Sequence, residues 1–325
     1  MEVRTLGALG PVSALTLGGG GIGALWGATT REEGIATLRE AVDSGITAID
    51  AAPGYNVCEE LIGAAFGGVW PEGVLLTTKC GIGNPEPGSV LATFRASLQT
   101  SLAAMRVDHV DAFFLHGHIG PPPGAPKSDA VGRDLGGHTP WRIYVQEVIP
   151  AFESLVDDGL IRGWALTGVD TPEAIIAAVG AARRPLAIQA VANFIDSPGS
   201  LTGAMPCPRP RDIIAAAAGA AVGVMGIRAV QAGALTVAFD REMDPIGPDA
   251  RDYEHVSPFR ALCTSWGEDP AIVAHRYALH MDGVDTLILG VKDRAELRAA
   301  IAFEGAGPLA SAQVEAIDAL NLRRV

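Results

Sequence analysis

The sequence predicts an α/β fold: a single (β/α)8 TIM barrel over residues 1–325, with an N-terminal β-hairpin and long loops at the C-terminal ends of its strands. Short apolar segments alternate with segments of helical periodicity about eight times, which is the repeat of this fold. The apolar segments are continuous, as is typical of parallel strands covered by helices. No shift in composition marks a linker between domains. A doubly wound sheet with an appended domain is the alternative fold.

The first half of the chain supplies the hairpin and the first repeats. Residues 3–6 and 12–15 flank a turn rich in glycine and proline, which predicts the hairpin. The segment Thr30-Arg31-Glu32-Glu33 is a capping-box pattern and predicts a helix that ends near Ser44. Apolar runs predict strands at 15–17, 46–49, 74–78 and 110–115, and helical spacing predicts helices at 59–66 and 91–105.

The second half continues the alternation. Strands are predicted at 161–166, 186–191, 222–226 and 286–289, and helices at 141–158, 172–182, 211–219, 270–281, 294–303 and 313–320. Segments without periodicity predict long loops at 117–140, 194–209 and 240–258. Because long loops in a compact domain usually carry function, we expect these three to shape a substrate pocket.

Charge and cysteine content exclude several classes of protein. The formal net charge is −13, so binding to a nucleic-acid phosphate backbone is not expected. The four cysteines form no C-x-x-C pair, so neither a disulfide framework nor a structural zinc site is predicted. No apolar stretch nears the roughly 18 residues that span a bilayer, and the N-terminus does not resemble a signal peptide. We expect a soluble cytoplasmic protein without membrane contact, of unknown oligomeric state.

Polar residues end three consecutive predicted strands. These are Asp50, Lys79 and His116, and Tyr55 lies in the loop after Asp50. The C-terminal strand ends of a barrel meet at one mouth, so the four side chains should lie together. Asp50 would keep Lys79 charged, and the Lys79 cation would depress the pKa of Tyr55. Tyr55 could then donate a proton to a carbonyl oxygen that His116 polarises, as hydride arrives at carbon.

Other chemistries are compatible with some of these residues. Residues 18–23 fit the G-x-G-x-x-G fingerprint of a Rossmann domain, but the predicted helix begins only at Thr30, so a flexible barrel-mouth loop is preferred. His116-x-His118 could bind a metal ion in a barrel hydrolase, although no carboxylates at later strand ends complete the ligand set. Lys79 could form a Schiff base, but this requires a neutral amine, which Asp50 opposes.

The motifs around these residues resemble those of the aldo-keto reductases. The resemblance follows the family's order over essentially the whole chain. Its segments are GITAIDAAPGYN (45–56), EELIG (59–63), LLTTKCG (75–81), DAFFLHG (111–117), DDGLIRGWALTG (157–168), IQAVANF (188–194), GIRAVQAGALT (226–236) and LILGVKDRAEL (287–297).

The resemblance implies a hydride-transferring enzyme that uses NADP(H) or NAD(H) and no metal. Tyr55 would be the general acid/base, tuned by Asp50 and Lys79, and His116 would orient a small carbonyl or sugar substrate, with Trp26 and His118 nearby. Thr167 and Gln189 would bind the nicotinamide carboxamide. The other cofactor contacts would come from Gly20, Gly21, Asp50, Ile227, Arg228, Ala229, Val230, Gly233, Leu235, Gly290, Lys292, Arg294 and Glu296.

Some positions depart from the family pattern. Gly168 replaces a common Asn, Ile227 an aromatic residue that stacks on nicotinamide, and Ala300 an Asn that contacts adenine. Lys292 and Arg294 could bind a 2′-phosphate, which favours NADP(H) over NAD(H). A nicotinamide-sensing subunit without turnover remains an alternative to an enzyme.

Overall fold

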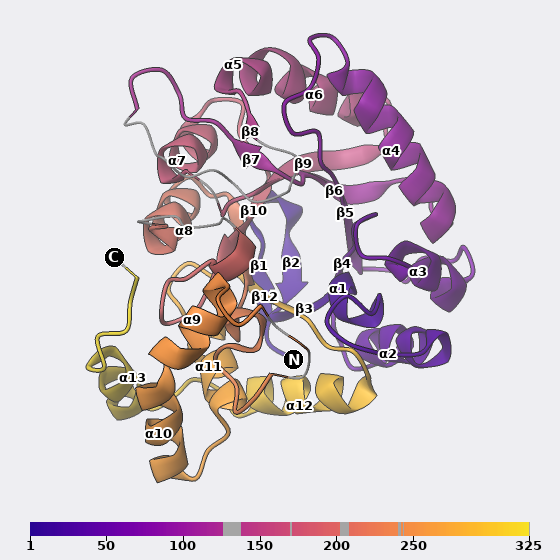
Figure 1. Ribbon diagram of the computed structural model, residues 1–325. Helices are drawn as coiled ribbons and strands as arrows, with labels where there is room; N and C mark the ends of the chain where they lie inside the picture. The colour runs from indigo at the N-terminus through magenta and orange to yellow at the C-terminus, as the bar shows by residue number, and fades with distance from the viewer. Residues whose placement is uncertain (126–137, 170, 202–207, 240–241, 243, 325) are drawn as a thin grey trace.

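A closed barrel of parallel strands forms the centre of the computed structural model, which describes residues 1–125, 138–169, 171–201, 208–239, 242 and 244–324 (Figure 1). Within these ranges the last barrel strand pairs with the first, Leu287 opposite Leu15, so the ring is complete. The predicted (β/α)8 fold is confirmed, and the doubly wound alternative is wrong because an open sheet has two unpaired edges. In spatial order the strands are β3 (Leu15–Gly18), β4 (Ala48–Asp50), β5 (Leu75–Cys80), β6 (Val110–Leu115), β9 (Ile161–Thr167), β10 (Ala187–Val191), β11 (Gly223–Ile227) and β12 (Thr286–Leu289).

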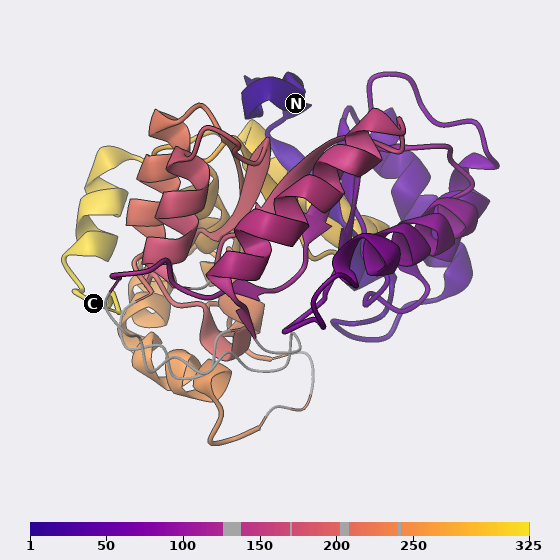
Figure 2. The same cartoon turned by 90° about the horizontal axis from the view of Figure 1, so that it is seen from above.

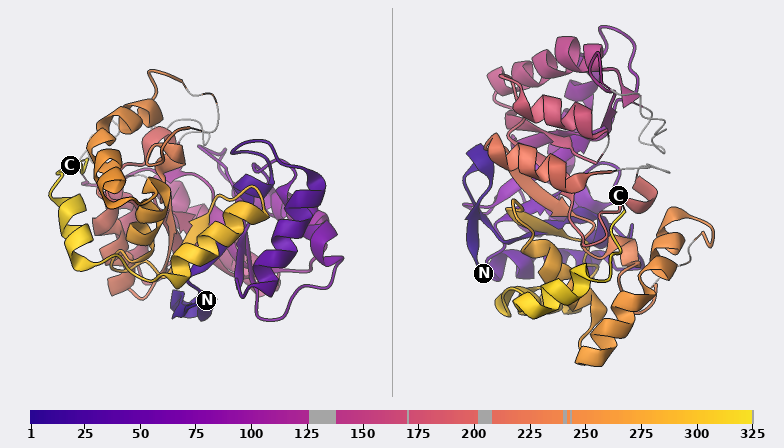
Figure 3. Two further views of the ribbon diagram at one scale, coloured as in Figure 1. Left: turned by 90° about the horizontal axis from the view of Figure 1, so that it is seen from below. Right: turned by 90° about the vertical axis from the view of Figure 1, so that its left-hand side faces the viewer.

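The N-terminal hairpin closes the bottom of the barrel. Strands β1 (Val3–Thr5) and β2 (Pro11–Ser13) pair antiparallel, and η1 (Gly7–Leu9) joins them. Leu6, Leu9 and Val12 are buried in one cluster with inward-facing strand residues such as Phe114 and Met225. Figures 2 and 3 show the hairpin at one end of the barrel, and helices α9 (Pro248–His255) and α10 (Ser257–Trp266) at the other. Binding chemistry therefore has to use the opposite mouth.

The outer layer consists of the helices that the periodicity predicts. Thr30 is the N-cap of α2 as expected, because its side chain accepts a hydrogen bond from the Glu33 amide, but the Glu33 carboxylate accepts from Arg294 and does not complete a capping box. The predicted helix at 141–158 is one helical run with a wide π turn in its middle, just before Pro150, whose missing N–H cannot continue an α-helical ladder. The helices are α2 (Arg31–Asp43), α3 (Cys58–Phe66), α4 (Val90–Met105), α5 (Trp141–Ile143), η2 (Tyr144–Val148), α6 (Ile149–Asp157), α7 (Pro172–Gly180), α8 (Pro210–Gly219), α11 (Pro270–Leu279), α12 (Arg294–Gly305) and α13 (Ser311–Asp318).

The predicted loops contain more structure than their sequences indicate. The prediction of a loop over 240–258 is wrong, because α9 and the start of α10 lie there. The polar sequence of α9 has no apolar stripe, and the helix is held instead through buried Asp252, which accepts hydrogen bonds from Ser197 and Gln231. In the loop at 117–140, β7 (His118–Ile119) pairs with β8 (His138–Thr139). Of the predicted loop positions, 126–137, 202–207, 240–241 and 243 lie outside the described residues.

The glycine-rich segment after β3 folds as a short helix, α1 (Gly19–Ile22). It is followed by a turn and not by the long helix that a Rossmann fingerprint requires, so the dinucleotide-binding Rossmann alternative is also wrong. None of the helices in the described part of the chain has the length and apolar character needed to cross a bilayer.

Candidate active site

A buried ion pair lies at the C-terminal ends of β4 and β5. The Lys79 ammonium donates to Asp50 Oδ2 at 2.6 Å and to the carbonyl oxygen of Ala51 at 2.8 Å. The two side chains are 0% and 2% exposed. Burial by itself lowers the pKa of Lys79, but the charge of Asp50 and the contact with Tyr55 outweigh it, and the pKa is raised. Lys79 therefore stays protonated, which is unsuited to a Schiff base.

Asp50 is tied to three strands of the barrel. Its Oδ1 accepts hydrogen bonds from Thr77 Oγ1 and from Gln189 Nε2, both at 2.7 Å, while Oδ2 takes Lys79. The carboxylate position is therefore fixed from β4, β5 and β10 together. Thr77 was not predicted, although the two-residue period of a strand places it on the same face as Lys79.

Tyr55 lies above this ion pair in the loop between β4 and α3. Lys79 Nζ is 4.8 Å from the centroid of its ring. Burial raises the pKa of the Tyr55 phenol, and the nearby Lys79 cation opposes this shift without overcoming it. The contribution of Lys79 has the expected sign, but the net shift of the pKa is upward, because desolvation of the phenolate outweighs the attraction of one ammonium. The phenol is protonated at neutral pH and available as a proton donor.

His116 completes the group directly after β6. Its ring meets the Tyr55 ring edge-on, with centroids 6.0 Å apart and an interplanar angle of 84°. Burial, followed by the charges of Lys79 and His118, lowers the pKa of His116 from 6.5 to about 3. The imidazole is therefore neutral at physiological pH and keeps one N–H for donation. The structure thus brings Asp50, Tyr55, Lys79 and His116 to one place.

The predicted substrate residues Trp26 and His118 take different positions. Trp26 packs against Gly20 and Gly290: a Cβ built on Gly20 would lie 2.6 Å from the indole nitrogen, and one on Gly290 would lie 3.5 Å from the ring. His118 is fully buried in β7, with its ring centroid 5.5 Å from that of His138. Across the described ranges, no three His, Cys, Asp or Glu side chains are grouped to hold a metal ion, so the metal-hydrolase alternative finds no ligand set there.

The residues predicted to bind the nicotinamide carboxamide lie on neighbouring strands. Thr167 ends β9, is 6% exposed, and donates to the carbonyl oxygen of Leu115. Gln189 is on β10 next to it, with its amide nitrogen already on Asp50. Gly21 on α1 lies so close to the end of β12 that a Cβ would meet Val291 O at 2.0 Å.

The predicted pyrophosphate segment after β11 has an unusual backbone. Arg228, Gln231 and Ala232 have φ values of 63°, 47° and 52°, and Gly233 has 96°. Such left-handed residues are uncommon outside glycine and cluster at functional turns. The turn is held by Arg228, which pairs with Asp249 at 3.3 Å. The predicted members of this segment, Ile227, Ala229, Val230 and Leu235, are buried or partly buried along it.

The predicted adenosine-ribose residues lie at the start of α12. Arg294 forms a two-pronged ion pair with Glu33 of α2, Nε to Oε1 and Nη2 to Oε2, both 2.9 Å. Lys292 Nζ is 3.1 Å from Glu296 Oε1. Both cations on which the expectation of NADP(H) rested therefore contact carboxylates.

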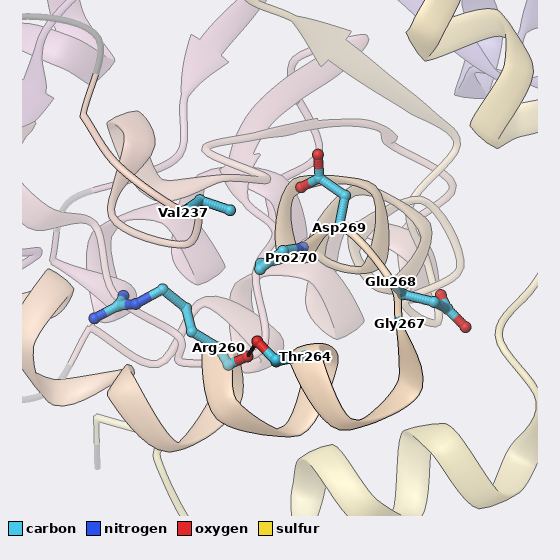
Figure 4. Close-up of a pocket in the computed structure, with 7 residues that line it drawn as sticks. All are labelled: Val237, Arg260, Thr264, Gly267, Glu268, Asp269 and Pro270. Carbon is cyan, nitrogen blue, oxygen red and sulfur yellow. Dashed lines mark hydrogen bonds between the residues drawn. The ribbon is translucent and has the colours of Figure 1, made fainter.

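A surface hollow of about 440 Å³ lies away from these residues, between the loop after β11 and the start of α11 (Figure 4). Its one lining cation, Arg260, donates to the carbonyl oxygens of Ala234 and Tyr253 and stacks on the Tyr253 ring at 3.8 Å. None of the predicted site residues lines it, so the hollow takes no part in the chemistry described above.

The chain is similar to known proteins in sequence and in fold. A model described as the Aldo/keto reductase family matches residues 14–322. An L-galactose dehydrogenase from Arabidopsis thaliana is 24% identical over 310 residues, which cover 93% of this chain and 88% of that protein. An NADH-specific methylglyoxal reductase from Escherichia coli (strain K12) is 31% identical over 128 residues, 34% of this chain and 39% of that protein.

The fold has close counterparts among solved structures. The holo form of an aldo-keto reductase, AKR11C1 from Bacillus halodurans, superposes with a TM-score of 0.73 at 22% identity, covering 98% of this chain and 96% of that one. This likeness concerns the fold. The family model spans almost the whole sequence, and on that ground the chain belongs to the aldo/keto reductase family.

Proposed function

We propose that this protein is an NAD(P)(H)-dependent oxidoreductase that interconverts a carbonyl compound, an aldehyde, ketone or sugar lactone, with its alcohol or lactol. One observation carries the proposal. A protonated Tyr55 and a neutral His116 lie above a fully buried Asp50–Lys79 ion pair, at the open mouth of the barrel. This set can deliver a proton to an oxygen and stabilise the charge that remains.

In the reducing direction, the nicotinamide dinucleotide supplies hydride to the carbonyl carbon. Tyr55 donates its phenolic proton to the carbonyl oxygen, and the neutral imidazole of His116 donates a hydrogen bond that holds the same oxygen. The phenolate left on Tyr55 is stabilised by Lys79, the ammonium already 4.8 Å from its ring centroid. Asp50 keeps Lys79 charged and in place, and Tyr55 regains a proton from solvent. Oxidation reverses these steps.

The residues around the mouth fit a dinucleotide. The turn after β11 has left-handed residues at Arg228, Gln231 and Ala232, and such backbone clusters at functional turns, which supports a ligand-binding role for it. Thr167 and Gln189 offer a hydroxyl and an amide oxygen beside the tetrad, which suits a neutral carboxamide. Gly20, Gly21 and Gly290 stay predictions as cofactor contacts, because a Cβ on Gly20 or Gly290 would meet Trp26 and one on Gly21 would meet the Val291 carbonyl oxygen.

A small polar carbonyl or sugar is the proposed substrate class. Two relatives support it by their names, an L-galactose dehydrogenase and a methylglyoxal reductase. Trp26 and His118 stay predictions as substrate contacts. The cytosol is the expected compartment. A nonenzymatic, nicotinamide-binding subunit is the alternative function that the experiment below distinguishes from an enzyme.

Tyr55→Phe tests the chemistry. The variant should lose about 100- to 10,000-fold in turnover, because general acid–base catalysis contributes on the order of 10²–10⁴-fold, while the Kd of the reduced dinucleotide stays within threefold. The substrate is first found by screening small aldehydes, ketones and sugars with NADH and with NADPH. Full turnover by the variant would remove Tyr55 from the mechanism. Tight dinucleotide binding without turnover of any substrate would favour the nonenzymatic subunit.

A further inference from the structure

Two basic residues at the start of α12 are held by acidic partners from two directions. Glu33 of α2 accepts both arms of the Arg294 guanidinium and also the Arg294 backbone N–H, at 2.9, 2.9 and 3.0 Å. Planar pairing of this kind uses the geometry with which arginine otherwise binds a phosphate. The contacts from the Arg294 side chain and backbone lower the pKa of Glu33 to about 2, so Glu33 is ionised at any physiological pH.

Lys292 likewise contacts a carboxylate through both its side chain and its backbone. Its ammonium lies 3.1 Å from Glu296 Oε1, and its backbone N–H donates to Glu296 Oε2 at 2.9 Å. Asp293 accepts the Glu296 backbone N–H at 2.9 Å and caps the helix. Two cations and three carboxylates therefore meet here, so the local formal charge is negative, and two of the first N–H groups of α12 are already bound by carboxylates.

The resemblance implies that the adenosine ribose lies at the start of α12, where this arrangement would discriminate between the two nicotinamide dinucleotides, since they differ by one phosphate on that ribose. A phosphate monoester carries a charge of about −1.5 to −2 at neutral pH. To bind Arg294 it would have to displace Glu33, and it would then face Glu296 and Asp293. A ribose 2′-hydroxyl is neutral and can donate to a carboxylate.

We infer that this protein selects NAD(H) over NADP(H), and that Glu33 is a specificity-determining residue. The inference rests on the proposed function, which brings a nicotinamide dinucleotide to this mouth of the barrel. Glu33 excludes the 2′-phosphate by occupying the guanidinium that would receive it, and Glu296 adds repulsion from the other side. Lys292 and Arg294, read from sequence as a phosphate site, serve here to position carboxylates.

The same two helices provide a matched control. Arg298 of α12 pairs with Glu40 of α2 in the same two-pronged geometry, at 2.5 and 2.8 Å. Glu40 follows Glu33 by seven residues, about 10 Å along the helix at 1.5 Å per residue. Glu33→Gln and Glu40→Gln therefore remove the same charge from the same interface, but only the first frees a cation at the helix start.

The experiment measures dissociation constants of NADH and NADPH by titrating the purified full-length chain calorimetrically, so no substrate or turnover is needed. We expect the unaltered protein to bind NADH at least tenfold more tightly than NADPH. Glu33→Gln should tighten NADPH binding roughly tenfold or more, as expected when an arginine becomes available to a phosphate, and should change NADH binding less than threefold. Glu40→Gln should leave the ratio of the two constants within twofold. Thermal unfolding of each variant confirms that it is folded.

The outcomes separate the two proposals. Tighter binding of NADPH by the unaltered protein, an unchanged NADPH constant in Glu33→Gln, or an equal effect of Glu40→Gln would overturn the role of Glu33 while leaving the oxidoreductase intact. Binding of neither dinucleotide would refute the proposed function and this inference together.

Discussion

Removal of the Asp50 charge should destabilise the protein far more than removal of a surface charge. In the structure the Lys79 ammonium is 2.6 Å from the Asp50 carboxylate and 0% exposed. Asp50→Asn keeps the size of the side chain and creates no cavity, but it leaves this buried ammonium without its anion. Loss of one partner of a buried ion pair costs about 3–5 kcal/mol. We expect the free energy of unfolding to fall by about that amount.

A double-mutant cycle with Lys79→Met isolates the pair. In Lys79→Met the Asp50 carboxylate keeps its hydrogen bonds from Thr77 and Gln189 but loses its cation. In the double variant no unpaired charge remains, so the two losses should not add. The double variant should be more stable than the sum of the single effects predicts by about 1–3 kcal/mol, the usual range for groups in contact.

The assay is urea unfolding at neutral pH, followed by tryptophan fluorescence and circular dichroism. Asp111→Asn is the control, because Asp111 is 19% exposed, pairs with Arg162 at only 3.7 Å, and accepts one hydrogen bond from the Leu76 amide. Its loss should cost about 1 kcal/mol. The stabilising role of Asp50 is refuted if Asp50→Asn lowers the free energy of unfolding no more than this control does, or if the effects of the two single variants add in the double variant. Either result would mean that Asp50 does not stabilise the buried Lys79 ammonium.

Three further perturbations follow from burial and close contact. The pKa of His116 falls from 6.5 to about 3 on folding, so its contribution to stability is complete above pH 6.5 and lost as the pH falls toward 3. His116→Gln should reduce the slope of the unfolding free energy against pH in this window by about 1.4 kcal/mol per pH unit. An acid-unfolding profile like that of the parent would contradict this. Burial raises the pKa of the Glu59 carboxyl, which accepts a hydrogen bond from Thr78 at 2.6 Å, so its contribution to stability is complete below pH 4.5 and lost at higher pH. The unfolding free energy of Glu59→Gln should therefore rise relative to that of the parent from pH 4.5 upward. A difference that stays constant across pH would argue against a shifted pKa of this carboxyl. Gly21→Ala would place a Cβ 2.0 Å from the Val291 carbonyl oxygen and should cost about 1–3 kcal/mol. Gly54→Ala, with nothing within 4 Å of its Cβ, should cost less than about 0.5 kcal/mol. Equal urea midpoints of the two variants would show that α1 and the segment after β12 do not approach so closely.

The strands and the meeting of four polar side chains at one mouth could be predicted because their signals are local. An apolar run that ends in a charged residue, as before Lys79, specifies both a buried strand and the mouth at which it ends. The rule that parallel strand ends converge then brings Asp50, Lys79 and His116 together without knowledge of any distance. Tyr55 follows from the short loop that begins at Asp50.

The rest depends on partners that are remote in sequence. Arg294 finds Glu33 at a separation of 261 residues, so a basic pair that indicates a phosphate site by itself has another meaning in the fold. Asp252 holds α9 through Ser197, 55 residues away, which is why a polar segment became helical. The sign of the pKa shift of Tyr55 depends on how deeply the ring is buried, and that depth is a property of the whole mouth.

The N-terminal hairpin and β3 can fold into place only after late parts of the chain have been synthesised. Leu6 and Leu9 leave the ribosome long before Met225, with which they are buried, and β3 pairs with residues as late as Leu289. At the usual 5–20 residues per second, roughly 15 to 55 s separate the emergence of β3 from that of its last neighbour. Throughout that interval the apolar side chains of the hairpin and of β3 stay exposed without their packing partners. The need for chaperones and the yield of folded protein should therefore depend on how quickly residues 220–289 are translated.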